Sequence, residues 1–387
     1  MSLPEIEDMN DSTSLVYKSL FKYLVVIEPL GFLYGSAGRF LSPENLVGRS
    51  GTSFPPSSAT LSGLFSAAYA QEERQKESDG DELKKKLKAR LEPLYFGGPF
   101  WAKSDSPQNF YVPTPFNFLV NKGEEHITFR LNRCVGCKKW LNQNGESPTG
   151  KFESETWLAI EDWEKLQSID WHNPPKVKKS PWKPIPHLHP QLREDERCVK
   201  IETLENNSER GSLFLENGVQ LDPDYCLVYL CNDEIKDGWY RFGGEGHIVD
   251  VRCLQLNKSN NNLLKLLTDN VGNSFALITP AIWGSNRLST RFPAEWNGDR
   301  YLETLLTERP SPFRYRLGGE GKTKRLSRGR YAVPAGTVYV LKEDIPPWQE
   351  WPDEWFPKEG PSLKRWGCGL ALPLPSAMGY PPEEAIA

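Results

Sequence analysis

The highest local density of side chains that can bind an anion lies between Arg314 and Arg330. This segment, RYRLGGEGKTKRLSRGR, holds seven Arg and Lys residues and a single acid, Glu320. Such an excess of positive charge attracts phosphate groups, and the interleaved glycines let backbone N–H groups approach an anion. The spacing of a nucleotide-hydrolysing P-loop is absent, so the segment predicts a phosphate cradle without hydrolysis; a solvated basic loop is the alternative. The expected phosphate contacts are Arg316, Gly318, Gly319, Gly321, Lys322, Lys324, Arg325, Arg328 and Arg330.

A second glycine-rich turn, RFGGEGHIVDVR, spans residues 241–252. Glycines next to a histidine and arginines can contact a nucleic-acid backbone. By itself such a turn is more often the tip of a hairpin than a ligand site. The expected phosphate-backbone contacts are Gly243, Gly244, His247 and Arg252.

The third candidate is the loop GSAGRFLSPENLVGRSGTSFPPSSAT, residues 35–60, which precedes a predicted helix. Ser57 and Ser58 can cap the first N–H groups of that helix, and a helix N-terminus attracts phosphate through its dipole. An ordinary long surface loop is the alternative, although such loops are more often functional or mobile than idle. The expected phosphate contacts are Arg39, Arg49, Ser57 and Ser58.

Cys134 and Cys137 form a CVGC pair that has the spacing of half a tetrahedral zinc site. No second CxxC or HxxxH supplies the other half, although two distant pairs could contribute to it, Cys226 with Cys231 or His187 with His189. We therefore favour a reduced thiol pair in a turn over zinc.

The sequence carries no nucleophile-elbow or zinc-protease motif, and no DxD pair lies near a candidate basic site. His247 is the one histidine in a candidate RNA loop, where an imidazole can act as general acid or base. A single imidazole next to glycines more often hydrogen-bonds or stacks, because RNA cleavage usually needs a second group. We expect no catalytic residue, no metal ligand and no cofactor.

Length and composition indicate a folded, two-domain protein. The chain has 387 residues, and the usual prior is about 150 residues per domain. Its net charge is only −4, so a nucleic-acid site must be a local basic patch. There is no apolar stretch of the roughly 20 residues that a membrane span needs, and the acidic start lacks a signal peptide, so we expect a cytoplasmic protein.

The apolar pattern predicts a strand at residues 23–34, a helix at 60–71, a charged helix or mobile loop at 72–92 and a helix at 149–166. Repeated prolines at 171–190 exclude a continuous helix or central strand, and we place the domain boundary there. The second half alternates short strands with turns, interrupted by one helix near 261–268. This pattern predicts the α+β class, with a ferredoxin-like unit as one candidate.

Aromatic residues gather close to the C-terminus among prolines. They fit a protein interface or the core of their own domain about equally well. The residues are Trp348, Trp351, Trp355, Phe356 and Trp366.

Taken together in this order, the segments resemble the third Cmr subunit of type III-B CRISPR effector complexes, a member of the RAMP superfamily. The resemblance is carried by IEPLGFLYGSAGRF, FPPSSATLSGLFSAA, YVPTPFNFL, TWLAIEDW, EDERCVKIE, RFGGEGHIVDVR, ALITPAIW, YAVPAGTVYVL and WGCGLALPLP.

The resemblance implies two ferredoxin-like (RRM-like) domains with long irregular insertions and Gly-rich loops. We expect a disordered tail at 1–12, an N-terminal domain at 13–190 with a charged insertion at 72–92 and a Pro-rich boundary segment at 171–190, and a C-terminal domain at 191–387. The implied function is a non-catalytic subunit that binds and caps the 5′ repeat-derived handle of the CRISPR RNA (crRNA). The phosphate contacts expected in the three loops above then become the expected RNA contacts.

The same resemblance implies partners. They are the crRNA handle, the large cyclase/polymerase-like subunit and the adjacent backbone RAMP subunit, with target RNA met only indirectly and no membrane. The alternatives are a Cas6-like metal-independent endoribonuclease that uses His247, and a structural adaptor that touches only protein.

Overall fold

The structure is a computed structural model. It describes residues 19–33, 54–75, 80–134, 138–190, 193, 198–199, 201–203, 209–211, 213–243, 246–257, 260–285, 287–296, 301–315 and 326–378. The chain combines helices with mostly antiparallel strands, as the sequence predicts at the level of class. No helix in these ranges is both long and apolar enough to cross a membrane.

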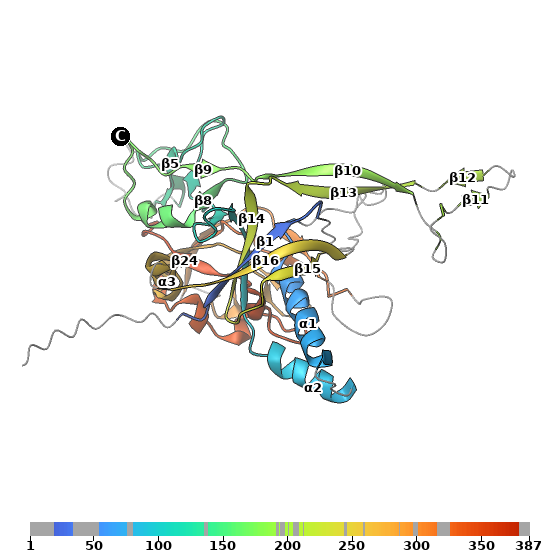
Figure 1. The fold of residues 1–387 in the computed structure, drawn as a ribbon. Helices are drawn as coiled ribbons and strands as arrows, with labels where there is room; N and C mark the ends of the chain where they lie inside the picture. Colours follow the sequence, from blue (N-terminus) through green and yellow to red (C-terminus); the bar gives the residue numbers. More distant parts are fainter. Residues whose placement is uncertain are drawn as a thin grey trace, which may run out of the picture.

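The larger sheet has eight strands in the order β15-β16-β1-β14-β2-β3-β8-β9 (Figure 1). The bounds are β1 Tyr23–Pro29, β2 Phe96–Lys103, β3 Tyr111–Pro113, β8 Trp157–Ala159, β9 Val177–Lys178, β14 Tyr225–Cys231, β15 Gly238–Phe242 and β16 His247–Gln255. The sheet contains strands from before and after residue 190, the predicted boundary between the two domains. The division into domains stays a prediction.

Strand β1 lies inside this sheet, which explains its uninterrupted apolar run. Side chains alternate between the two faces of a strand. Val25 and Ile27 therefore face one core, which they share with helix α1. Leu24 and Val26 face the opposite core, which they share with the second sheet.

Helix α1 spans Ser58–Gln75 and confirms the helix predicted at 60–71. Its buried side chains include Leu61, Leu64, Phe65 and Tyr69, spaced three and four residues apart on one face. That spacing lays the helix against the larger sheet.

The charged segment 72–92 forms the end of α1 and a second helix, α2 (Gly80–Leu91), none of whose described residues is buried. Lys86 and Glu82 form an ion pair at 2.8 Å one turn apart. The guanidinium of Arg90 lies 3.6 Å from the centre of the Tyr69 ring and holds α2 against α1. Of the two predicted alternatives, the solvated helix is confirmed for residues 80–91.

The second sheet has four strands in the order β20-β23-β17-β24. The bounds are β17 Gly272–Leu277, β20 Leu302–Leu306, β23 Val338–Ile345 and β24 Ala371–Pro373. Helix α3, Asn261–Thr268, precedes it and confirms the helix predicted there. Both sheets contain four neighbouring strands with the same topology. When the four are ranked by their order along the chain, they lie side by side as fourth, first, third and second. These strands are β16-β1-β14-β2 in the larger sheet and β24-β17-β23-β20 in the second sheet.

A long hairpin of β10 (Trp182–Pro190) and β13 (Leu213–Leu221) projects from the body, with β11 (Ile201–Thr203) and β12 (Glu209–Gly211) near its end (Figure 1). The N–H and C=O of Val219 bond to Leu33 and not to Pro184, its neighbour on β10. Pro184 therefore occupies a position that requires no N–H. The prediction that these prolines exclude a central strand is confirmed, since β10 belongs to a two-stranded arm.

The helix predicted at 149–166 is wrong in its first part. Residues Trp157–Ala159 form strand β8, which pairs with β3, and a 3-10 helix, η2, follows at Ile160–Gln167. Pairing across the sheet overrides the helical pattern of this segment.

The remaining elements are short. They are β4 Phe118–Leu119, β5 Phe129–Arg130, β6 Asn132–Arg133, β7 Trp140–Leu141, β18 Trp283–Gly284, β19 Ser289–Thr290, β21 Ser311–Phe313, β22 Arg330–Ala332 and the 3-10 helices η5 Ala294–Trp296, η6 Trp348–Glu350, η7 Asp353–Trp355 and η8 Leu363–Trp366.

The C-terminal aromatic cluster is core. Trp348 and Trp351 are 1% exposed and Phe356 is 2% exposed. Trp355 and Trp366 are half-buried against the same core. The interface interpretation of this cluster is therefore wrong, because these rings pack against Phe275, Trp283 and Trp296 of their own chain.

Candidate nucleic-acid interface

The two ends of the basic segment 314–330 are joined at its base. The N–H of Ser327 donates to the carbonyl of Tyr315 at 2.8 Å, and the N–H of Tyr315 donates to the Ser327 hydroxyl at 3.0 Å. Both residues are buried, and the Tyr315 ring packs edge-on against Trp366. The described ends of the segment therefore form a fixed stem.

A carboxylate from a distant part of the chain reinforces this stem. Glu359 accepts a hydrogen bond from Nη1 of Arg330 at 2.5 Å and another from the backbone N–H of Arg328 at 2.9 Å. The Arg330 side chain is 4% exposed, whereas Arg328 is exposed. Burial and the ion pair give Arg330 an anchoring role, and RNA contact by either arginine stays a prediction.

The rest of the predicted cradle lies outside the described residues. This applies to Arg316, Gly318, Gly319, Gly321, Lys322, Lys324 and Arg325. Their RNA contacts stay predictions.

The turn at 243–246 joins β15 to β16, so the hairpin interpretation of this segment is confirmed. Phe242 pairs with His247 across the turn. Gly243 has φ 78°, in the left-handed region that glycine adopts readily. Gly244 lies outside the described residues, and RNA contact by Gly243, Gly244 and His247 stays a prediction.

Arg252 lies further along β16 and forms an ion pair with Glu28 of β1. Its guanidinium is 39% exposed, at the edge of an open part of the sheet. Because Glu28 already balances its charge, Arg252 is a weaker attractor of phosphate than an unpaired arginine would be. RNA contact by Arg252 stays a prediction.

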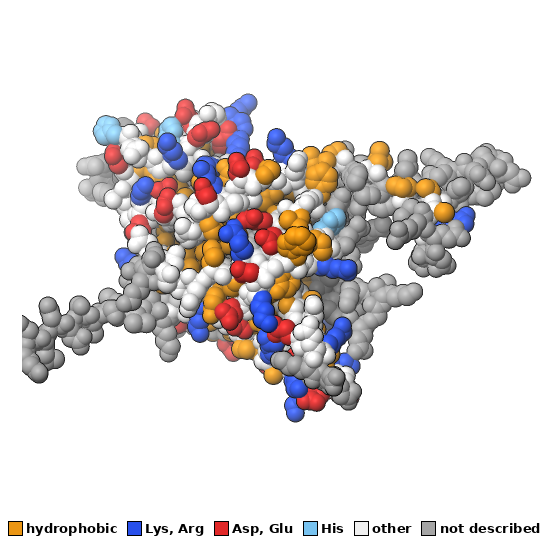
Figure 2. All heavy atoms as spheres, in the orientation of Figure 1, with side chains coloured by type: hydrophobic (Ala, Val, Ile, Leu, Met, Phe, Trp, Pro, Cys, Tyr) orange, Lys and Arg blue, Asp and Glu red, His pale blue; other side chains and the backbone are white. Residues whose placement is uncertain are grey.

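The open part of the sheet beside Arg252 is an amphipathic surface. Three apolar side chains are exposed on it: Trp239 at 74%, Leu30 at 54% and Ile248 at 41%. Strand register places Trp239, Asp250 and Glu28 in one row across β15, β16 and β1. Figure 2 shows hydrophobic atoms over β15 and β16, with acidic and basic side chains close by.

The start of α1 borders a mainly apolar cavity of about 360 Å³. Ser57 and Ser58 line it together with aromatic residues from distant segments, Phe54, Trp157, Phe313 and Trp366. The Ser58 hydroxyl is buried and donates to the carbonyl of Gly98 at 3.1 Å. Arg39 and Arg49 lie outside the described residues, so the RNA contacts of this third candidate loop stay predictions.

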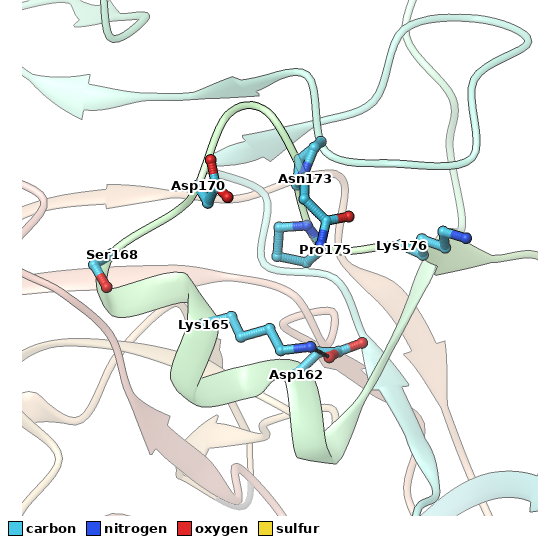
Figure 3. A pocket seen from close by; sticks show the side chains of 8 residues that line it. Asp162, Lys165, Ser168, Asp170, Asn173, Pro175 and Lys176 are labelled. Atoms are coloured by element: carbon cyan, nitrogen blue, oxygen red, sulfur yellow. Dashed lines mark ion pairs between the residues drawn. The ribbon is translucent and has the colours of Figure 1, made fainter.

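A polar hollow of about 360 Å³ lies between η2 and the loop that leads to β9 (Figure 3). Lys165 and Asp162 of η2 form an ion pair at 2.5 Å on its floor. Asp170 and Lys176 add one charge of each sign. The balanced charges give this hollow no preference for a polyanion.

Burial makes Cys226 and Cys231, the candidate distant thiol pair, poor metal ligands. It raises the pKa of Cys226 and of Cys231 to about 12. Cys134 is buried and disulfide-bonded, so its interpretation as a reduced thiol is wrong, and a disulfide sulfur offers no thiolate to zinc. Cys137 lies outside the described residues, within which no group of three His, Cys, Asp or Glu side chains is arranged to hold a metal ion.

A comparison with protein-family models matches residues 26–375 to the family described as CRISPR-associated protein (Cas_Cmr3). The chain belongs to the Cas_Cmr3 family. The match spans most of the 387 residues and confirms the resemblance seen in the sequence. Membership in the Cas_Cmr3 family supports a role as a subunit of a type III CRISPR effector complex. A search of curated proteins gives no match.

Solved structures similar to this Cas_Cmr3 chain come from type III CRISPR assemblies. One is a type III-B Cmr-beta complex bound to cognate target RNA, with TM-score 0.43 and 13% identity over 82% of this chain and 86% of that chain. Another is a Csm3-Csm4 subcomplex of the type III-A interference complex, with TM-score 0.38 and 12% identity over 84% and 94% of the chains. A third is a Csm1-Csm4 cassette in complex with cA4, with TM-score 0.32 and 10% identity over 83% and 87%.

Proposed function

We propose that this chain is a non-catalytic RNA-binding subunit of a type III CRISPR ribonucleoprotein. In this role it binds and caps the 5′ repeat-derived handle of the crRNA. It also bridges the large subunit to the adjacent backbone RAMP subunit, and it meets target RNA only indirectly. Family membership supports the assembly, and the anchored basic segment supports the RNA contact.

The single observation that carries RNA binding is the basic segment on its fixed stem. Seven Arg and Lys residues against one acid leave a local excess of positive charge. A flexible basic tail would lose conformational entropy when it binds, whereas ends joined through Tyr315, Ser327 and Glu359 reduce that loss. Fixed ends of this kind favour binding of a phosphate backbone at one position.

The same proposal extends to the fold. In a ferredoxin-like unit, two split βαβ crossovers produce an antiparallel sheet with the strand order fourth, first, third, second. Both sheets of this chain have that order. We therefore assign one ferredoxin-like unit to each sheet. In the larger sheet, α1 and α2 lie in the first crossover, and β15 with its flanking loops forms the second. In the second sheet, the described parts of both crossovers contain short strands or 3-10 helices in place of an α-helix.

The main alternative is a Cas6-like endoribonuclease with His247 as general acid or base. Incubation of the purified protein with repeat RNA is expected to give binding without scission. Metal-independent cleavage that His247→Ala abolishes would establish the alternative. A protein-only adaptor would instead give no RNA crosslinks on this subunit in the assembled complex.

The decisive experiment changes the charge of the basic segment. Replacement of Lys324, Arg325 and Arg328 by Gln should weaken binding to handle RNA and to scrambled RNA alike, because phosphate contacts carry no sequence information. The slope of log affinity against log salt should flatten by about 0.7 for each phosphate of a single strand that the variant no longer neutralises.

A matched control removes three exposed lysines elsewhere. Replacement of Lys85, Lys88 and Lys103 by Gln changes net charge equally and should leave affinity and slope close to wild type. If the triple variant of the basic segment keeps wild-type affinity and slope, the segment is a solvated loop and the proposed function fails.

A further inference from the structure

Two large apolar side chains are exposed beside the stem of the basic segment. Tyr331 of β22 is 54% exposed and Leu288 is 66% exposed. The hydroxyl of Ser289 accepts a hydrogen bond from the N–H of Tyr331 at 3.1 Å. This bond places the β18–β19 hairpin, which carries Leu288 at its turn, next to β22.

The described residues of the hairpin turn contact one another. The Ser285 hydroxyl accepts from the N–H groups of Arg287 and Leu288 at 3.2 and 3.1 Å. Gly284 has φ 95°, and a Cβ there would lie 2.3 Å from the Leu288 carbonyl oxygen. Tight packing of this kind fixes the position of Leu288, and with it the neighbouring Arg287.

The charge around Tyr331 favours a polyanion. Residues 284–296 contain two exposed arginines, Arg287 and Arg291, and one exposed acid, Glu295, in η5. Arg328, three residues before Tyr331, is exposed as well. Trp239, the other strongly exposed aromatic residue among those described, differs because two carboxylates share its row on the sheet.

We infer that Tyr331 is a base-stacking platform for single-stranded RNA, with Arg287 and Arg291 as additional phosphate contacts. An exposed aromatic ring within a basic surface offers a π-face to a base while the arginines hold the flanking phosphates. Pro312, exposed and paired with Tyr331 across β21 and β22, extends the apolar surface. This inference rests on the proposed RNA-binding function and identifies how bases are engaged at the same site.

The test compares two probes on the full chain: labelled single-stranded handle RNA, and an abasic ribose-phosphate strand of the same length. Tyr331→Ala should weaken binding of the base-containing RNA about five- to hundredfold, the range of one stacking contact. Affinity for the abasic strand and the salt slope should stay at the wild-type values, because every phosphate-binding side chain is kept. Tyr331→Phe keeps the ring and should bind like wild type.

Two further variants sharpen the result. The double variant Arg287→Gln, Arg291→Gln should bind both probes more weakly and should have a flatter slope of log affinity against log salt. The control Trp171→Ala truncates an aromatic side chain that lies elsewhere and is 41% exposed. It should change neither the affinity for the two probes nor the salt slope.

The inference is overturned if Tyr331→Ala binds the base-containing RNA like wild type, or weakens both probes equally. Unchanged RNA binding together with loss of another protein subunit would identify the surface as a protein interface and would also overturn it. Failure of the proposed function would look different: the wild-type protein would bind neither probe, or the triple variant of the basic segment would bind both probes like wild type.

Discussion

Arg330 donates to Glu359 at 2.5 Å across 29 residues of sequence and ties β22 to the segment before η8. The guanidinium is 4% exposed and the carboxylate 16%. Removal of one partner of a buried pair leaves the other charge uncompensated, which costs about 3–5 kcal/mol.

Glu359→Gln should therefore lower the free energy of unfolding by about 3 kcal/mol. Urea unfolding at neutral pH measures it, with the exposed Glu354→Gln as control. A decrease no larger than that of the control would show that the ion pair does not anchor the stem.

Truncation of two tryptophans should have very different effects on stability. Trp351 is 1% exposed within the aromatic core, so Trp351→Ala should cost about 3–5 kcal/mol. Trp239 is 74% exposed, so Trp239→Ala should change stability by no more than about 0.5 kcal/mol. Thermal unfolding of the two variants side by side checks the assignment, and an unaltered transition in Trp351→Ala would restore the interface interpretation.

Ionisation of Glu153 should make the stability of the folded protein depend on pH in the acid range. Its carboxylate accepts from Nζ of Lys179 at 2.7 Å, from the N–H of Gly123 at 2.9 Å and from Nζ of Lys122 at 3.0 Å. These contacts lower its pKa from 4.5 to about 2. A carboxyl group whose pKa is lower in the folded than in the unfolded protein stabilises the folded state. This stabilisation is complete at pH values above the unfolded-state pKa, and it is lost as the pH falls toward about 2.

Wild type should thus be more stable than Glu153→Gln above about pH 4.5, and the difference should shrink as the pH falls through that window. Urea midpoints measured over this range test the prediction. The exposed Glu161→Gln should show no such convergence. A difference that stays constant with pH would contradict an ionised Glu153 as the source.

The hairpin arm should be dispensable for folding. Replacement of residues 186–217 by an Asn-Gly turn would join Ile185 to Gly218, which are already paired in register. The buried Val219 and Leu221 remain, so the cooperative unfolding transition should be preserved with a similar midpoint. Loss of a cooperative transition would show that the arm belongs to the folding unit.

The sequence by itself determined the local elements. The three-and-four spacing of Leu61, Leu64 and Phe65 predicted α1. The apolar run at 23–34 predicted a strand, which the structure forms at 23–29, and the prolines before residue 190 excluded a central strand. These features depend on neighbours within a few residues, which a pattern can express. The resemblance to the Cmr subunit depended on the order of several such segments.

Only the tertiary structure decided which residues anchor the candidate site. Glu359 meets Arg330 and Ser327 meets Tyr315 through chain reversals that no local spacing encodes. Residues 157–159 became a strand because β3 offered backbone partners, against their helical pattern. The C-terminal tryptophans became core because the second sheet covers them. Burial and long-range pairing are properties of the folded chain. They determine that Arg330 anchors the stem, whereas Arg328 is exposed.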